Sequence, residues 1–149
     1  MEQPVTSSDA LPPSRGRFYA VRCKPGEDLL AGLRSFVAAR GLKAVSIVTA
    51  VGSLNTAPLR LANTGVWETR QGHFEIVSLV GTIDEQGEHL HISLSDRHGV
   101  TVGAHFGLGS AVYTTAEIVL VELEDYTFTR KPCSLSGYDE LVVEPRRAD

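Results

Sequence analysis

The feature of this sequence that most restricts its fold is an alternation of apolar and polar residues on both sides of one short turn. Residues 89–96 alternate histidine and serine with leucine and isoleucine, and residues 100–106 alternate apolar residues with small or polar ones. A period of two is typical of a β-strand with one buried face. The two segments are therefore predicted to pair as a β-hairpin.

The turn between these segments fixes which residues face each other. Residues 97–99 suffice for a three-residue loop with Gly99 in the left-handed conformation. The register must also keep the two apolar faces together, because a slip of one residue would turn one apolar set away from the core. Both conditions place His91 opposite His105, with His89 two residues further along the same face.

Three histidines, His89, His91 and His105, are thus predicted to converge on one side of the hairpin. Cross-strand neighbours lie about 4.5–5.5 Å apart and neighbours along a strand roughly 7 Å apart, so three rings can reach one ion. Neutral imidazole suits zinc, nickel, copper or iron, and three histidines leave a coordination position open. We expect a divalent metal, with zinc as the first choice. The alternative is a solvent-facing strand on which histidines recur. We interpret His73, which precedes a strand, and His98, which lies in the turn, as surface histidines.

The rest of the chain predicts an α+β fold, a mainly antiparallel sheet with one principal helix. The helix is expected from Glu27, with both Glu27 and Asp28 in its first turn and Gly41 as its stop. Its apolar stripe consists of Leu29, Leu30, Leu33, Phe36 and Val37. Strands are expected at residues 17–23, 44–51, 59–62, 74–83, 112–123 and 126–130, with a break or bend at Gly52-Ser53 and a turn-rich excursion at 64–71.

Length and charge limit the architecture and the partners. The 149 residues suit one domain, expected at 17–143 between a disordered tail at 1–16 and a frayed end at 144–149. A net charge of -4 argues against nucleic acid as the main partner. The two cysteines, Cys23 and Cys133, are far apart, so we expect no disulfide and a reducing, cytoplasmic location. We expect no signal peptide and no membrane span.

Several segments resemble, in order and spacing, the plant- and prokaryote-conserved (PPC) domain family. They are Lys24-Pro25-Gly26-Glu27-Asp28-Leu29, Val51-Gly52-Ser53-Leu54, residues 74–83, His89-Leu90-His91, Gly103-Ala104-His105, Thr115-Ala116-Glu117 and Gly137-Tyr138. The resemblance covers nearly all of residues 17–143 and implies an antiparallel sheet with a flanking helix, assembled as a homotrimer. It also implies a metal held by the histidines that match His89, His91 and His105, and it brings no settled reaction.

Plant members of that family join the domain to AT-hooks, whose core is Arg-Gly-Arg-Pro. This chain has Arg15-Gly16-Arg17-Phe18, without the proline and without a preceding basic cluster. Such a segment lacks the phosphate contacts that a minor-groove hook needs. A DNA-associated role is therefore kept only as an alternative.

Two other functions remain open. The first is a metal-dependent enzyme or a protein that binds a small molecule, for which the nearby acids or bases would be Glu75, Glu88, Asp96 or Glu117. Ser53 lacks the surroundings of a nucleophile elbow, and no catalytic residue is assigned. The second is an oligomerisation and protein-interaction module, because one helix cannot bury all of the apolar surface that the predicted strands present.

Overall fold

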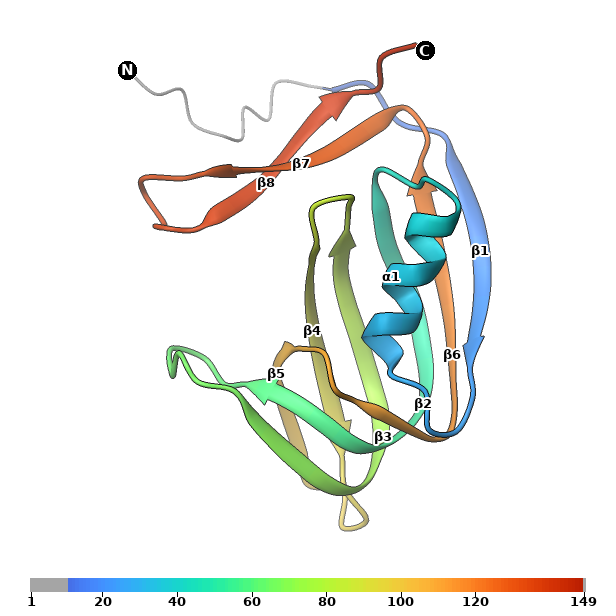
Figure 1. Ribbon diagram of the computed structural model, residues 1–149, viewed down its shortest axis with the longest axis vertical. Helices are drawn as coiled ribbons and strands as arrows, with labels where there is room; N and C mark the ends of the chain where they lie inside the picture. Colours follow the sequence, from blue (N-terminus) through green and yellow to red (C-terminus); the bar gives the residue numbers. More distant parts are fainter. Residues whose placement is uncertain (1–10, 149) are drawn as a thin grey trace.

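The computed structural model describes residues 11–148, which form one helix and eight strands (Figure 1). In chain order they are β1 (Gly16–Cys23), α1 (Leu29–Ala39), β2 (Val45–Arg60), β3 (Glu68–Ile83), β4 (Glu88–Ser95), β5 (Thr101–Phe106), β6 (Ala111–Leu123), β7 (Tyr126–Pro132) and β8 (Asp139–Pro145). The α+β prediction with a single helix is confirmed. The first ten residues of the expected tail, and Asp149, lie outside the described chain. In the described part, no helix is long and apolar enough to cross a membrane.

The main sheet is antiparallel and partly closed. Its strand order is β1-β6-β2-β3-β4-β5, and β2 also pairs with β5 at the far end of the sheet. The closing contacts join Leu59 to Phe106 and Arg60 to His105. Strands β2 to β5 therefore form a small closed ring, and this closure brings the end of β2 beside the histidine hairpin.

Helix α1 crosses one face of the sheet in front of β2 and β6 (Figure 1). Its first turn differs from the expectation, because the helix begins at Leu29 and Asp28 is its N-cap. The Asp28 carboxylate accepts hydrogen bonds from the backbone N–H groups of Leu30 (3.0 Å) and Ala31 (3.2 Å). Capping satisfies donors that a helix cannot satisfy internally, which outweighs a place for acids within the turn. The predicted stop is confirmed, since Gly41 follows the C-cap with a φ of 60°.

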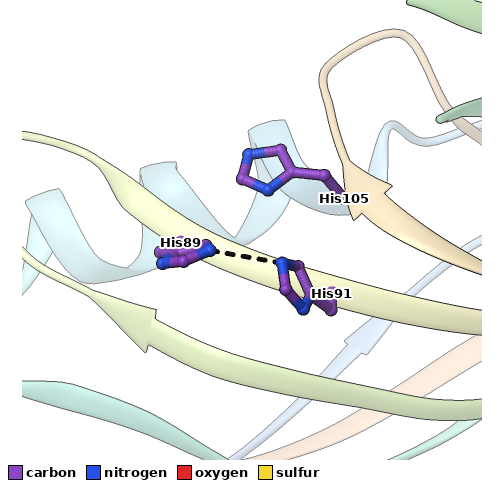
Figure 2. Close-up of side chains that lie close together, drawn as sticks. All are labelled: His89, His91 and His105. Carbon is purple, nitrogen blue, oxygen red and sulfur yellow. Dashed lines mark hydrogen bonds between the residues drawn. The ribbon is translucent and has the colours of Figure 1, made fainter. Parts of the chain in front are cut away.

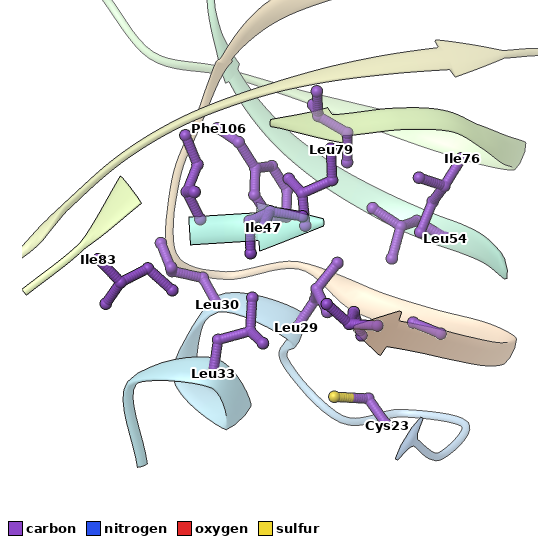
Figure 3. Close-up of a cluster of buried hydrophobic side chains, with 14 of the residues drawn as sticks. Cys23, Leu29, Leu30, Leu33, Ile47, Leu54, Ile76, Leu79, Ile83 and Phe106 are labelled. Atoms are coloured by element: carbon purple, nitrogen blue, oxygen red, sulfur yellow. The ribbon is translucent and has the colours of Figure 1, made fainter. Parts of the chain in front are cut away.

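The core lies between the helix and the inner face of the sheet (Figure 3). The predicted stripe supplies Leu29, Leu30, Leu33 and Val37 as buried residues, while Phe36 packs at the edge. The sheet supplies the rest, including Leu54, Leu59, Leu79, Ile83, Leu90, Ile92, Leu94, Phe106, Ile118 and Leu120. Burial of each large apolar side chain contributes about 1.5–3 kcal/mol, so this layer is the main source of stability.

Two expectations in the middle of the chain differ from the structure. Gly52-Ser53 bends β2, which is one of the two outcomes expected there, but it does not break the strand, so the segments predicted at 44–51 and 59–62 form one strand. The expected turn-rich excursion at 64–71 contains the start of β3, because residues 68–71 pair with the end of β2. Pairing partners far along the chain decide both cases, and local composition does not reveal them.

The C-terminal segment forms a second, two-stranded sheet that the sequence did not predict. Strand β8 pairs with β7 through Glu144 and Pro145, so these two residues are strand rather than a frayed end. The hairpin is fixed to the main sheet by Arg130, whose Nε donates to Asp84 Oδ2 at 2.9 Å and whose Nη2 donates to Thr82 Oγ1 at 3.0 Å. It therefore stands at a defined position over the turn between β3 and β4 (Figure 1).

Candidate metal centre

The histidine hairpin has the predicted register. His91 pairs with His105 and Ser95 with Thr101. The loop is the predicted one, because Gly99 has a φ of 76° and its N–H donates to the Asp96 carbonyl at 3.0 Å. The Asp96 carboxylate also accepts from the backbone N–H of His98 at 2.8 Å and of Val100 at 3.0 Å. This side chain accordingly stabilises the turn that sets the register.

The two faces of β4 divide as the alternation predicts. Leu90, Ile92 and Leu94 are at most 1% exposed and belong to the core. His89 and His91 lie on the opposite, exposed face, and His105 of β5 is half-buried beside them. The burial of the leucine side holds the histidines outward, since turning the strand over would place imidazoles in the core and leucines in water.

The three imidazole rings point toward one another (Figure 2). Ring centroids are 4.9 Å apart for His89 and His91, 5.1 Å for His89 and His105, and 5.4 Å for His91 and His105. One ring nitrogen from each residue lies within 4.8 Å of the others, and the Nε2 atoms of His89 and His91 are 3.2 Å apart. The rings come from two strands, and the hairpin register brings them together.

This donor set fits a first-row divalent metal. Zinc–nitrogen bonds of about 2.0–2.1 Å in a tetrahedron require nitrogens roughly 3.3 Å apart, close to the separation of the His89 and His91 nitrogens. Small rotations of the His105 ring would shorten the remaining separations. Three neutral nitrogens suit zinc, copper, nickel or iron better than calcium or magnesium, which prefer oxygen.

The electrostatics of the cluster favour neutral imidazole. The pKa values of His89 and His105 are both lowered, first by burial. For His89 the next cause is the neighbouring His91, and for His105 it is the guanidinium of Arg60. A neutral ring is the form that binds a metal, so the surroundings prepare these two residues for that role.

A glycine on β3 lets that strand approach the histidine strand closely. Gly81 pairs with Leu90 and has a φ of 133°. A Cβ atom at this position would lie 1.9 Å from the His89 carbonyl oxygen. Any larger residue would therefore push β3 away from the first histidine, which makes Gly81 part of the support of the site.

A wide cavity of about 1110 Å³ opens over the three histidines. Its lining includes residues from the β2–β3 turn and from the β7–β8 hairpin, which project on the same side of the main sheet (Figure 1). The charged and aromatic lining beyond the histidines includes Arg60, Arg130 and Tyr138. A bound metal would thus face a space large enough for a small organic molecule.

Sequence reasoning missed Arg60. This residue ends β2 and pairs with His105 across the ring closure, so its side chain shares the face of the three histidines. Its guanidinium carbon also lies 5.7 Å from the Trp67 ring centroid, and the Trp67 ring lies 5.7 Å from that of His105. Arg60 lies near the histidines because β2 pairs with β5, and no local pattern in the sequence predicts that pairing.

The structure separates most other candidates from the cluster. Glu88 lines the cavity but is ion-paired with Arg34, whose Nε donates to it at 2.8 Å. Asp96 supports the turn, and Ser53 shares a hydrogen bond of 2.8 Å with Thr114. Glu75 and Glu117 are exposed and do not line the cavity.

The other histidines do not join the site. His73 stacks on Tyr113 with ring centroids 4.4 Å apart, and His98 lies exposed in the turn. Within residues 11–148, the group formed by His89, His91 and His105 is the one set of three that could hold a metal.

The fold and the site together define a class of protein, a single-helix, largely antiparallel α+β domain with three histidines gathered on the β4–β5 hairpin. The chain belongs to the Plants and Prokaryotes Conserved (PCC) domain family, which it matches over residues 11–124. The sequence motifs resembled this same family, so the predicted family is confirmed.

Relatives of known name extend the comparison. The bifunctional protein GlmU of a Synechococcus strain is 38% identical over 139 residues, which make up 93% of this chain. The matched region is 22% of that protein, so the chain spans about a fifth of the relative's length.

Solved structures share the fold. A hypothetical protein from Salmonella enterica is 43% identical with a TM-score of 0.89, and the match covers 90% of this chain and 97% of that one. A metal-containing protein from Archaeoglobus fulgidus is 22% identical with a TM-score of 0.73, over 85% of this chain and 93% of that one. A candidate DNA-binding protein from Bacteroides thetaiotaomicron is 23% identical with a TM-score of 0.70, over 87% and 93%. At 22% and 23% identity, the last two likenesses show the fold alone.

Proposed function

We propose that this protein binds a divalent metal, zinc by preference, through His89, His91 and His105, and that the metal site serves to bind a small molecule. The observation that carries the proposal is the convergence of three ring nitrogens within 4.8 Å at the floor of an open cavity. A structural zinc site is typically closed by four protein ligands, whereas three histidines leave one position for water or a ligand. The metal-containing relative from Archaeoglobus is consistent with this proposal.

Metal analysis tests the proposal. Protein purified without chelator should contain about one equivalent of metal per chain, and His91→Ala or His105→Ala should remove most of it. His98→Ala is the matched control, because it deletes an imidazole from the same hairpin at the turn, outside the cluster. Equal metal content in all four proteins would reject the site.

We also propose that the chain assembles as a homotrimer. Its support is the apolar surface left on the outer face of the sheet, where Phe18, Val48, Val51, Val77 and Val80 are each at least 51% exposed. Helix α1 covers the other face, so a neighbouring subunit is the natural cover for this one. Light scattering should return about 48 kDa, three times the chain mass of 16.1 kDa. A stable monomer would contradict it.

The DNA-associated alternative has weaker support. Arg17 lies in β1 rather than in an extended hook. Arg15 forms an ion pair with Asp125 at 2.9 Å and Arg17 with Glu124 at 2.7 Å, so both arginines already have acidic partners. Retention on duplex DNA at physiological salt would revive this alternative.

We propose a cytoplasmic location for the protein, where the free thiols of Cys23 and Cys133 would stay reduced.

A further inference from the structure

We infer that the small molecule bound over the metal site carries a carboxylate, and that Arg60 is the residue that recognises it. The inference rests on the proposed metal site and names the class of ligand, a short dicarboxylate or hydroxy acid. One oxygen of such a molecule would occupy the open position near the histidines, and its carboxylate would pair with the guanidinium.

The position of Arg60 is the first support. Arg60 and His105 are direct partners across the β2–β5 ladder, so their side chains leave the sheet from neighbouring points on one face. Directly opposed residues of a ladder have Cβ atoms about 4.5–5.5 Å apart. Both side chains therefore start close enough together on this face for one small molecule to contact them both.

The second support is that the Arg60 guanidinium has no acidic partner in the described part of the chain. Within residues 11–148 no carboxylate forms an ion pair with this guanidinium, whereas Arg130, the other arginine of the cavity, pairs with Asp84 at 2.9 Å. A guanidinium keeps its charge at any physiological pH and presents a planar fork that matches a carboxylate. Arg60 therefore offers an unmatched cation to a ligand in the cavity.

The indole ring of Trp67 beside Arg60 limits the motion of the Arg60 side chain. The guanidinium carbon lies 5.7 Å from the Trp67 ring centroid, within the range of a cation–π contact. Trp67 is held near the site because its ring packs over Gly107, where a Cβ atom would approach it to 2.6 Å. A side chain held in one place loses less freedom when it binds a ligand.

The acidic residues of the cavity favour a small carboxylate over an anion with many charges. Glu88 is neutralised by Arg34, but Asp139 and Glu140 of β8 add negative charge to the lining. These carboxylates would repel a polyphosphate or a nucleic-acid backbone, each of which brings several charges. A small carboxylate brings one or two, which the metal and Arg60 match.

Calorimetry with malonate on the cobalt-loaded protein tests the inference. The wild-type chain should bind malonate, with a change in the visible spectrum of the cobalt. Arg60→Gln should weaken malonate binding about ten-fold or more, because a hydrogen bond to a charged group contributes about 1.5–3 kcal/mol. Arg60→Lys should recover part of the loss and guards against misfolding of the first variant. Arg97→Gln removes a charge at the far turn and should change nothing.

The outcomes separate the two proposals. Unchanged malonate affinity in Arg60→Gln, or no malonate binding by the wild-type chain, would overturn the role of Arg60. Failure to take up cobalt would instead reject the metal site, and the malonate titration would then be made on the metal-free chain. If the metal-free chain binds malonate and Arg60→Gln weakens that binding, the contact between Arg60 and a carboxylate is retained. If the metal-free chain does not bind malonate through Arg60, that contact is overturned as well. Inorganic phosphate that binds more tightly than malonate would overturn the choice of carboxylate.

Discussion

His91 and His105 face each other across the β4–β5 ladder, with their ring centroids 5.4 Å apart. This one pair links the turn to the cluster, because the loop at residues 97–99 fixes which residue of β5 meets each residue of β4. A hairpin one residue out of register would place the His105 ring on the leucine face. The metal site is therefore a consequence of turn geometry.

The turn should accordingly be sensitive to Gly99. Gly99→Ala introduces a Cβ at a φ of 76°, where an L-residue is strained by roughly 1–2 kcal/mol. We expect the free energy of unfolding, measured in urea, to fall by about that amount. Gly103→Ala on β5 is the control, since Gly103 has no positive φ and its added Cβ would closely meet only the rotatable Ser93 hydroxyl, at 3.3 Å, so the loss should be smaller. Equal losses would show that the left-handed turn does not matter.

The apolar side of the histidine strand should carry much of its stability. Leu90 lies between His89 and His91 and is fully buried. Leu90→Ala should lower the free energy of unfolding by about 2–5 kcal/mol through lost burial and a residual cavity. Val100→Ala, at a position 66% exposed, should cost far less. Chemical denaturation of both variants checks the difference, and a similar cost would contradict the assignment of the core.

The ion pair between Arg130 and Asp84 should contribute more to the free energy of unfolding than the ion pair between Lys131 and Glu144. Arg130 meets Asp84, whose side chain is fully buried, whereas Lys131 meets Glu144 on the surface. Arg130→Met leaves a buried carboxylate without its partner and should cost about 3–5 kcal/mol. Lys131→Met should cost about 1 kcal/mol or less. Thermal melting of the two variants compares them, and a reversed order would refute this account of the hairpin.

The histidines should make the metal-free protein sensitive to mild acid. Because the pKa values of His89 and His105 are lowered in the folded chain, the unfolded chain takes up protons first as the pH falls through about 6.5. Stability should therefore decline below that pH and level off once the folded histidines are also protonated. His105→Ala should show a shallower decline between pH 7 and 5 in urea unfolding. A wild-type chain that gains stability over this range would contradict the lowered pKa values.

The parts of the fold that follow from local rules were predictable from the sequence. The hairpin register followed from Gly99 and the apolar alternation, and the helix stop followed from Gly41. These signals act within a few residues, so no knowledge of distant partners is needed.

The features that depend on distant pairing were not predictable. The continuation of β2 through Gly52 depends on β3 and β6, and strand β8 exists because β7 pairs with it. Arg60 reaches the candidate site only because β2 closes onto β5. A sequence pattern reports the face on which a residue lies, but it does not report which strand comes to lie beside it.

The most direct test of the metal site is a crystal structure of protein purified without chelator, with diffraction data recorded on both sides of the zinc absorption edge. We predict one anomalous peak per chain, about 2.0–2.1 Å from a nitrogen of each of His89, His91 and His105. A map with no peak at the three rings, or with the peak at another group of residues, would contradict the central claim.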